Sequence, residues 1–148
     1  MGVLIDASIL IEFERSQVAI EQKLAGREDE EFFLSVVTAS ELLHGVHRAR
    51  ASDVRARRSA FVEAVLSRFP LLSIDLPTAR THAQIWAELA STGKMIGPHD
   101  LWIAAACIAH GLTLVTANVR EFQRVPGLAI ESWPSGTSVQ QERSGRVS

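Results

Sequence analysis

Five short apolar runs, separated by longer amphipathic stretches, constrain the fold of this chain more than any other feature. The runs are strand-like and lie at Val3–Ile5, Phe33–Val37, Leu71–Ile74, Thr113–Thr116 and Leu128–Glu131. The stretches between them repeat apolar residues with helical spacing. This spacing predicts helices at Ala7–Arg15, Val18–Ala25, Thr38–Ala49, Asp53–Phe69, Pro77–Ser91 and Pro98–Ala109. Strands that alternate with helices indicate an α/β fold, with a short parallel sheet of about five strands flanked by helices.

Length and composition are those of one folded domain followed by a polar tail. The chain has 148 residues, of which 47% are hydrophobic, so it can bury a full core. Cys107 is the single cysteine, which excludes an intramolecular disulfide and a zinc site built on several thiolates. We expect a folded domain over residues 1–133 and a disordered tail over 134–148, where Val139 and Val147 are the large aliphatic residues.

The sequence predicts neither a membrane-spanning segment nor an export signal. No apolar stretch approaches the roughly 20 residues that span a bilayer. No basic region precedes the first apolar run, and Asp6 interrupts that run, which argues against a signal peptide. We therefore expect a soluble cytoplasmic protein.

Three acids that are far apart in the sequence share one kind of position. Asp6, Glu41 and Asp100 each stand where a predicted strand ends or a predicted helix begins. Ligands of open parallel sheets bind beyond the carboxyl ends of the strands, so these acids can meet in one pocket. Carboxylates held together repel one another unless a cation lies between them. Hard oxygen ligands favour Mg²⁺ or Mn²⁺, and the pattern predicts such a site.

Each acid also has a purely structural interpretation. Asp6 is a favoured type of helix N-cap, and Ser8 can serve as a cap or as a support for the acid. Glu41 follows Thr38 with the spacing of a capping box, in which the glutamate bonds back to the cap residue. Asp100 lies in the first turn of a predicted helix, where a negative charge suits the helix dipole. Local pattern alone leaves these alternatives open.

A cluster of arginines follows the second of these acids. It consists of Arg48, Arg50, Arg55, Arg57 and Arg58. The net charge of −2 gives no general sign of nucleic-acid binding, so the distribution of charge matters more than its sum. Guanidinium groups suit bidentate phosphate contacts, which predicts possible RNA contacts here, although a solvated helical surface explains the cluster equally well.

Four segments, taken in order, carry a resemblance to a known family. They are Leu4-Ile5-Asp6-Ala7-Ser8, Ser35-Val36-Val37-Thr38-Ala39-Ser40-Glu41-Leu42, Ile96-Gly97-Pro98-His99-Asp100-Leu101-Trp102-Ile103-Ala104-Ala105, and Leu112-Thr113-Leu114-Val115-Thr116-Ala117-Asn118-Val119-Arg120-Glu121-Phe122. Together they resemble the PIN-domain nucleases, and specifically the VapC-type ribonuclease toxins of toxin–antitoxin pairs. The resemblance extends from residue 3 to about residue 133.

The resemblance implies a PIN-like fold and a site for one or two Mg²⁺ or Mn²⁺ ions. Asp6, Glu41 and Asp100 match the acidic positions of the family, while Ser8 and Thr116 match hydroxyl positions that support the acids. Asn118 falls at a fourth catalytic position, where many relatives carry aspartate and others carry asparagine. Asparagine there removes one negative charge and puts tight binding of a second ion in doubt.

The implied function is that of a metal-dependent endoribonuclease toxin that cleaves RNA phosphodiester bonds. A VapB-like antitoxin would neutralise it, and homodimerisation through helical surfaces is also implied. One alternative is a catalytically weak PIN fold that binds RNA or protein. A phosphatase of the haloacid-dehalogenase type also begins with an acid after its first strand, but it needs a second acid where Ser8 stands.

Overall fold

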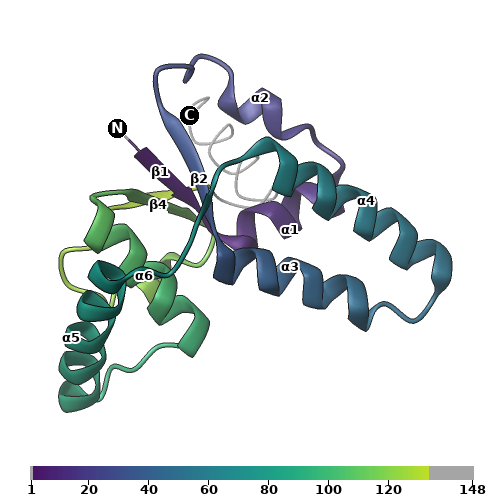
Figure 1. Ribbon diagram of the computed structural model, residues 1–148. Helices are drawn as coiled ribbons and strands as arrows, with labels where there is room; N and C mark the ends of the chain where they lie inside the picture. Colours follow the sequence, from purple (N-terminus) through teal and green to yellow (C-terminus); the bar gives the residue numbers. More distant parts are fainter. Residues whose placement is uncertain (1, 134–148) are drawn as a thin grey trace, which may run out of the picture.

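The protein folds around one parallel sheet, seen edge-on near the centre of Figure 1. The structure is a computed structural model and describes residues 2–133. Its strands are β1 (Gly2–Ile5), β2 (Glu31–Ser35), β3 (Leu71–Leu72), β4 (Thr113–Thr116) and β5 (Ile130–Ser132). They lie in the order β3-β2-β1-β4-β5, and every neighbouring pair is parallel. The predicted parallel α/β fold is therefore confirmed.

Helices cover both faces of the sheet. They are α1 (Ala7–Ser16), α2 (Ile20–Leu24), α3 (Val36–Arg48), α4 (Ser52–Arg68), α5 (Leu76–Thr92), α6 (Pro98–His110) and α7 (Val119–Phe122). In Figure 1, α1, α2, α3 and α4 lie to one side of the strands, while α5 and α6 form a pair on the other side. Gly93 and Gly111 end α5 and α6 in the left-handed conformation that glycine adopts without strain.

Successive side chains of a strand point to opposite faces of the sheet, so the hydrophobic core has two parts. Val3 and Ile5 of β1 pack into the core shared with α1, α3 and α4, whereas Leu4 packs into the core shared with α5 and α6. All three side chains are buried. Because both faces of the sheet are covered, the strands read as continuous apolar runs, as is usual for a parallel sheet.

The strand order reverses beside β1. The chain moves from β1 to β2 and β3 on one side, and later returns to β4 on the other side. Such a reversal leaves a crevice at the carboxyl ends of the two central strands. Asp6 comes directly after β1, and Thr116 is the last residue of β4, so both lie at this crevice.

The second strand ends earlier than the apolar pattern predicts. We expected a strand over Phe33–Val37, but Ser35 ends β2 and caps α3, because its hydroxyl accepts a hydrogen bond from the Val37 N–H at 3.0 Å. Val36 and Val37 are therefore the first residues of a helix, although β-branched residues favour strands. Here a side-chain cap outweighs local propensity.

Smaller differences concern the sheet edges and one short helix. The structure reduces β3 to two residues, and β5 begins two residues later and ends one residue later than predicted. We did not predict α7, whose four residues are too few to show helical periodicity. The tail predicted for residues 134–148 lies outside the described residues. Among the residues described, no helix is both long and apolar enough to cross a bilayer.

Candidate active site

Asp6 is held in place by hydrogen bonds to both its backbone and its side chain. Its backbone N–H donates to the carbonyl of Val115 at 2.9 Å, which continues the sheet pairing by one residue. Its side chain is buried, and Oδ2 accepts hydrogen bonds from Ser8 Oγ at 2.7 Å and Thr116 Oγ1 at 2.8 Å. Both hydroxyls bond to Oδ2, and no hydrogen bond from residues 2–133 reaches Oδ1. That oxygen is left for a ligand.

This arrangement replaces the capping interpretation of Asp6. The residue stands at the N-cap position of α1, but its carboxylate makes no hydrogen bond to the backbone of that helix. Ser8 and Thr116 are in turn held by the turn after β4, since Ala117 N–H donates to Ser8 Oγ and Asn118 N–H donates to Thr116 Oγ1. The network joins the ends of β1 and β4 and orients a single carboxylate.

Glu41 lies in the second turn of α3, and it is not part of a capping box. Ser35 rather than Thr38 caps the helix, so the capping interpretation of Glu41 is wrong. Glu41 Oε1 is buried and has no hydrogen-bond partner among the described residues. His99 Nδ1 is 3.6 Å from this oxygen, which is beyond hydrogen-bonding distance. Burial, and then the charge of Asp6, raise the pKa of Glu41.

Asp100 is the acid most strongly perturbed by its surroundings. It lies in the first turn of α6, where the helix dipole favours a negative charge. Nevertheless, burial raises the pKa of Asp100 to about 7, with further contributions from the charges of Asp6, Glu121 and Glu41. Three segments far apart in the sequence therefore place their carboxylates within electrostatic reach of one another.

Glu121, on α7, is a fourth acid that sequence reasoning did not single out. Its Oε1 accepts a hydrogen bond from the Gly97 N–H at 2.7 Å, and its Oε2 accepts one from Asn118 Nδ2 at 3.1 Å. The Gly97 bond is the largest of the causes that lower the pKa of Glu121, and the charge of Glu121 in turn helps to raise the pKa of Asp100. Glu121 therefore adds a further carboxylate beside Asp100.

Asn118 lies beside Glu121 at the start of α7. Its amide donates to Glu121, so the position joins the site through a neighbouring acid instead of adding a charge of its own. The spacing Asn118-x-x-Glu121, which is typical of a helix start, was the signal in the sequence that could have revealed Glu121.

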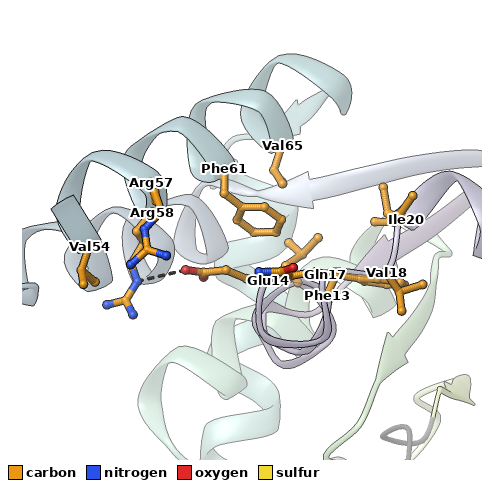
Figure 2. Close-up of a pocket in the computed structure, with 12 residues that line it drawn as sticks. Phe13, Glu14, Gln17, Val18, Ile20, Val54, Arg57, Arg58, Phe61 and Val65 are labelled. Atoms are coloured by element: carbon orange, nitrogen blue, oxygen red, sulfur yellow. Dashed lines mark hydrogen bonds and ion pairs between the residues drawn. The ribbon is translucent and has the colours of Figure 1, made fainter.

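The arginine cluster divides into two groups. Arg55 donates to the carbonyl of Ala49 at 3.0 and 2.7 Å and so satisfies the C-terminus of α3. Arg58 donates to the Gly45 carbonyl and pairs with Glu14 at 3.1 Å, as the dashed line in Figure 2 marks. These two arginines hold α3, α4 and α1 together. Arg48, Arg50 and Arg57 are exposed, and Arg57 makes a weak, solvated pair with the Asp53 carboxylate and a long hydrogen bond of 3.5 Å to the Asp53 carbonyl.

Beside these arginines, a groove of about 510 Å³ runs between α1 and α4. Figure 2 shows Phe61 and Val65 pointing from α4 toward α1, with Phe13 and Val18 on the opposite wall. Val18 is 46% exposed, which is unusual for an aliphatic side chain in a concave surface. The groove is apolar at its floor and charged at its rim, where Arg58 meets Glu14.

The acids suit a hard divalent cation. Within residues 2–133, no three acidic, histidine or cysteine side chains are grouped closely enough to ligate one ion unaided. Mg²⁺ typically keeps several waters and takes only one or two carboxylates from the protein, so a complete protein cage is not required. The unpartnered Glu41 Oε1 and the free Oδ1 of Asp6 are suitable hard donors. By this test the residues fit Mg²⁺ or Mn²⁺.

Comparison with known proteins identifies the family of this chain. The model of the PIN domain matches residues 3–128. Ribonuclease VapC1 of Rickettsia felis is 37% identical over 130 residues, which cover 88% of this chain and 95% of that protein. The tRNA(fMet)-specific endonuclease VapC of Salmonella typhimurium is 41% identical over 100 residues, covering 68% of this chain and 74% of that protein.

Solved structures give the same result. The DNA-bound VapBC of Salmonella typhimurium contains a chain that superposes with a TM-score of 0.81 at 33% identity, covering 90% of this chain and 98% of that one. A chain of VapBC2 from Rickettsia felis, bound to a DNA fragment of its promoter, superposes with a TM-score of 0.80 at 26% identity. The match covers 90% of this chain and 99% of that one. The fold and these relatives together show that the chain belongs to the PIN-domain family, among the VapC ribonucleases.

Proposed function

We propose that this protein is a divalent-metal-dependent endoribonuclease and the toxin of a toxin–antitoxin pair. The observation that carries the proposal is the joining of Asp6, Glu41 and Asp100 at the strand-order reversal, where burial and mutual repulsion raise the pKa of Asp100 to about 7. Strongly perturbed acids in a crevice are characteristic of functional sites. A set of helix caps would not need three carboxylates within reach of one another.

The residues of the site have distinct proposed roles. Asp6, Glu41 and Asp100 offer the oxygens that would hold the cation, and Ser8 and Thr116 keep the Asp6 carboxylate in one orientation. A bound divalent cation lowers the pKa of a water molecule and neutralises charge that develops on the phosphate. Burial and the neighbouring negative charges raise the pKa of Asp100, and a bound cation would offset these charges.

RNA is the proposed substrate because the relatives are named as ribonucleases or as a tRNA endonuclease. Single-stranded or loop RNA suits such a site better than a duplex, since its bases and backbone can be presented individually. Arg48, Arg50 and Arg57 are the arginines still available for phosphate contacts, whereas Arg55 and Arg58 support the helices.

A small antitoxin of the VapB type is the proposed partner, as in the VapBC complexes of similar fold. The groove between α1 and α4 is suited to the apolar face of an amphipathic helix, because its floor is lined by Phe13, Phe61 and Val65. We also propose a homodimer, which sedimentation at several concentrations would test.

The alternative function, a catalytically weak binding module, depended on the missing charge at Asn118. Glu121 weakens that alternative, because it brings a further carboxylate into contact with both Asn118 and Asp100. The departure from aspartate at position 118 therefore does not leave the site short of acids.

RNA cleavage by the antitoxin-free protein tests the proposal. We expect cleavage of single-stranded RNA with Mg²⁺ or Mn²⁺, none with EDTA, and a loss of at least about 100-fold in Asp6→Asn. Asp29→Asn, the same change at an exposed acid in a loop, should retain full activity. Cleavage that persists in EDTA, or in a folded Asp6→Asn variant, contradicts the proposal.

A further inference from the structure

A row of four flat side chains extends from the acidic site along the helices α6 and α5. This aromatic row consists of His99, Trp102, His82 and Trp86. The rings of Trp102 and His82 are stacked, with centroids 3.5 Å apart and planes inclined by 14°. The ring of Trp86 meets His82 edge-on, with centroids 5.8 Å apart. The row therefore joins two helices through ring-to-ring contact.

One end of the aromatic row lies at the catalytic acids. His99 precedes Asp100 in the sequence, and its Nδ1 is 3.6 Å from Oε1 of Glu41. Trp102 follows His99 by three residues on α6, so the two side chains share one face of the helix. A molecule bound at the acids would meet His99 first and then Trp102.

The other end of the row is open to solvent. Trp86 is 55% exposed, and the His99 side chain is 63% exposed. Packing of α5 against α6 explains why Trp102 and His82 touch, but it gives no reason for a large aromatic side chain to remain exposed one turn beyond them. Burial also lowers the pKa of His82, which keeps this ring neutral at neutral pH and suited to stacking.

We propose that the aromatic row binds unpaired nucleobases of the RNA strand on one side of the scissile phosphate. The inference rests on the proposed ribonuclease function and adds a base-binding site to it. The acids themselves repel a phosphate backbone, so affinity for RNA must come from contacts beside them. Stacking on aromatic side chains is a general means of holding single strands, because every base has a flat face.

Binding of a short single-stranded oligoribonucleotide in EDTA tests the inference without any cleavage. Tryptophan fluorescence reports stacking directly. Trp86→Ala should weaken binding about 10-fold, which is within the range of one lost base–aromatic stack. Trp86→Phe should keep most of the affinity. Leu76→Ala is the matched control, because it removes another exposed apolar side chain, 61% exposed, from the same helix.

A strand with abasic positions completes the test. It should bind wild type about as weakly as the intact strand binds Trp86→Ala, and Trp86→Ala should lose little further affinity for it. Equal binding of both strands by wild type overturns the inference. So does a Trp86→Ala variant that binds RNA normally but no longer dimerises, because the row would then belong to a contact between two copies of the chain.

The two proposals can fail separately. Base-dependent binding at Trp86, with no cleavage in Mn²⁺, would support the aromatic row and contradict the nuclease. Cleavage with an unchanged KM in Trp86→Ala would support the nuclease and overturn the aromatic row.

Discussion

Replacing Asp100 by asparagine should stabilise the metal-free protein, although it removes a residue of the proposed active site. The pKa of Asp100 rises from 3.8 to about 7 on folding, so the fold opposes ionisation of this carboxyl. Each tenfold change in proton affinity corresponds to about 1.4 kcal/mol. The free-energy cost of ionising Asp100 in the folded state therefore reaches about 4 kcal/mol above pH 7. Partial exposure of the site reduces this ceiling, and we expect about 1–2 kcal/mol in practice.

The dependence on pH follows from the direction of the shift. Because the folded state holds the proton more tightly than the unfolded state, wild type loses stability relative to Asp100→Asn as the pH rises from about 4 to about 7. The advantage of the variant should be absent near pH 4 and constant above pH 7. Asp100 is a cleaner probe than Asp6, whose carboxylate has hydrogen bonds that asparagine would disturb.

Urea or thermal unfolding in EDTA at several pH values measures this difference. For a chain of this length, about 1–2 kcal/mol corresponds to a rise in Tm of roughly 2–8 °C at pH 8. Millimolar Mn²⁺ should stabilise wild type, by about 2.7 kcal/mol at a hundred times its Kd, and Asp100→Asn much less. The reasoning is refuted if the metal-free variant is less stable at pH 8, or if Mn²⁺ raises the Tm of both proteins equally.

Three further predictions concern the acids, the arginines and the groove. Glu41→Gln should remain folded but lose at least about 100-fold in RNA cleavage, and near-normal turnover would remove Glu41 from the mechanism. Neutralising Arg48, Arg50 and Arg57 should lower the salt dependence of RNA binding by roughly 0.7 in the log–log slope for each phosphate that these side chains bind, while an unchanged slope would leave them as a solvated surface. Val18→Glu, at the rim of the groove, should weaken antitoxin binding in a pull-down without changing cleavage by the free toxin; undiminished binding would place the antitoxin elsewhere.

The sheet and its flanking helices could be predicted because their signals are local and repeated. Val3, Leu4 and Ile5 form a continuous apolar run, which is typical of a strand covered on both faces. The acids Asp6 and Asp100 could be assigned to one crevice because general rules fix where parallel strands end. Such rules require no knowledge of individual contacts.

Other features depend on contacts that the sequence does not reveal. Ser35 and Thr38 are both acceptable N-caps, and only the backbone geometry selects Ser35 and so releases Glu41 from a capping box. Arg55 and Arg58 read as exposed charges, yet they bind backbone carbonyls of α3 and of the residue that follows it. Glu121 was missed for a similar reason, since Gly97 and Asp100, which relate it to the other acids, come from another segment of the chain.

The central claim is that carboxylates from separate segments share one divalent cation, and site-directed oxidation tests it most directly. Fe²⁺ can replace Mg²⁺ at oxygen ligands, and with peroxide and ascorbate it generates radicals that cut the nearest backbone. Mass spectrometry of the fragments should locate cuts beside Asp6, Glu41, Asp100 and Glu121. An excess of Mg²⁺ should suppress all of them together, and Asp6→Asn should abolish them. Cuts confined to one segment, or an unchanged pattern in Asp6→Asn, would contradict a shared metal site.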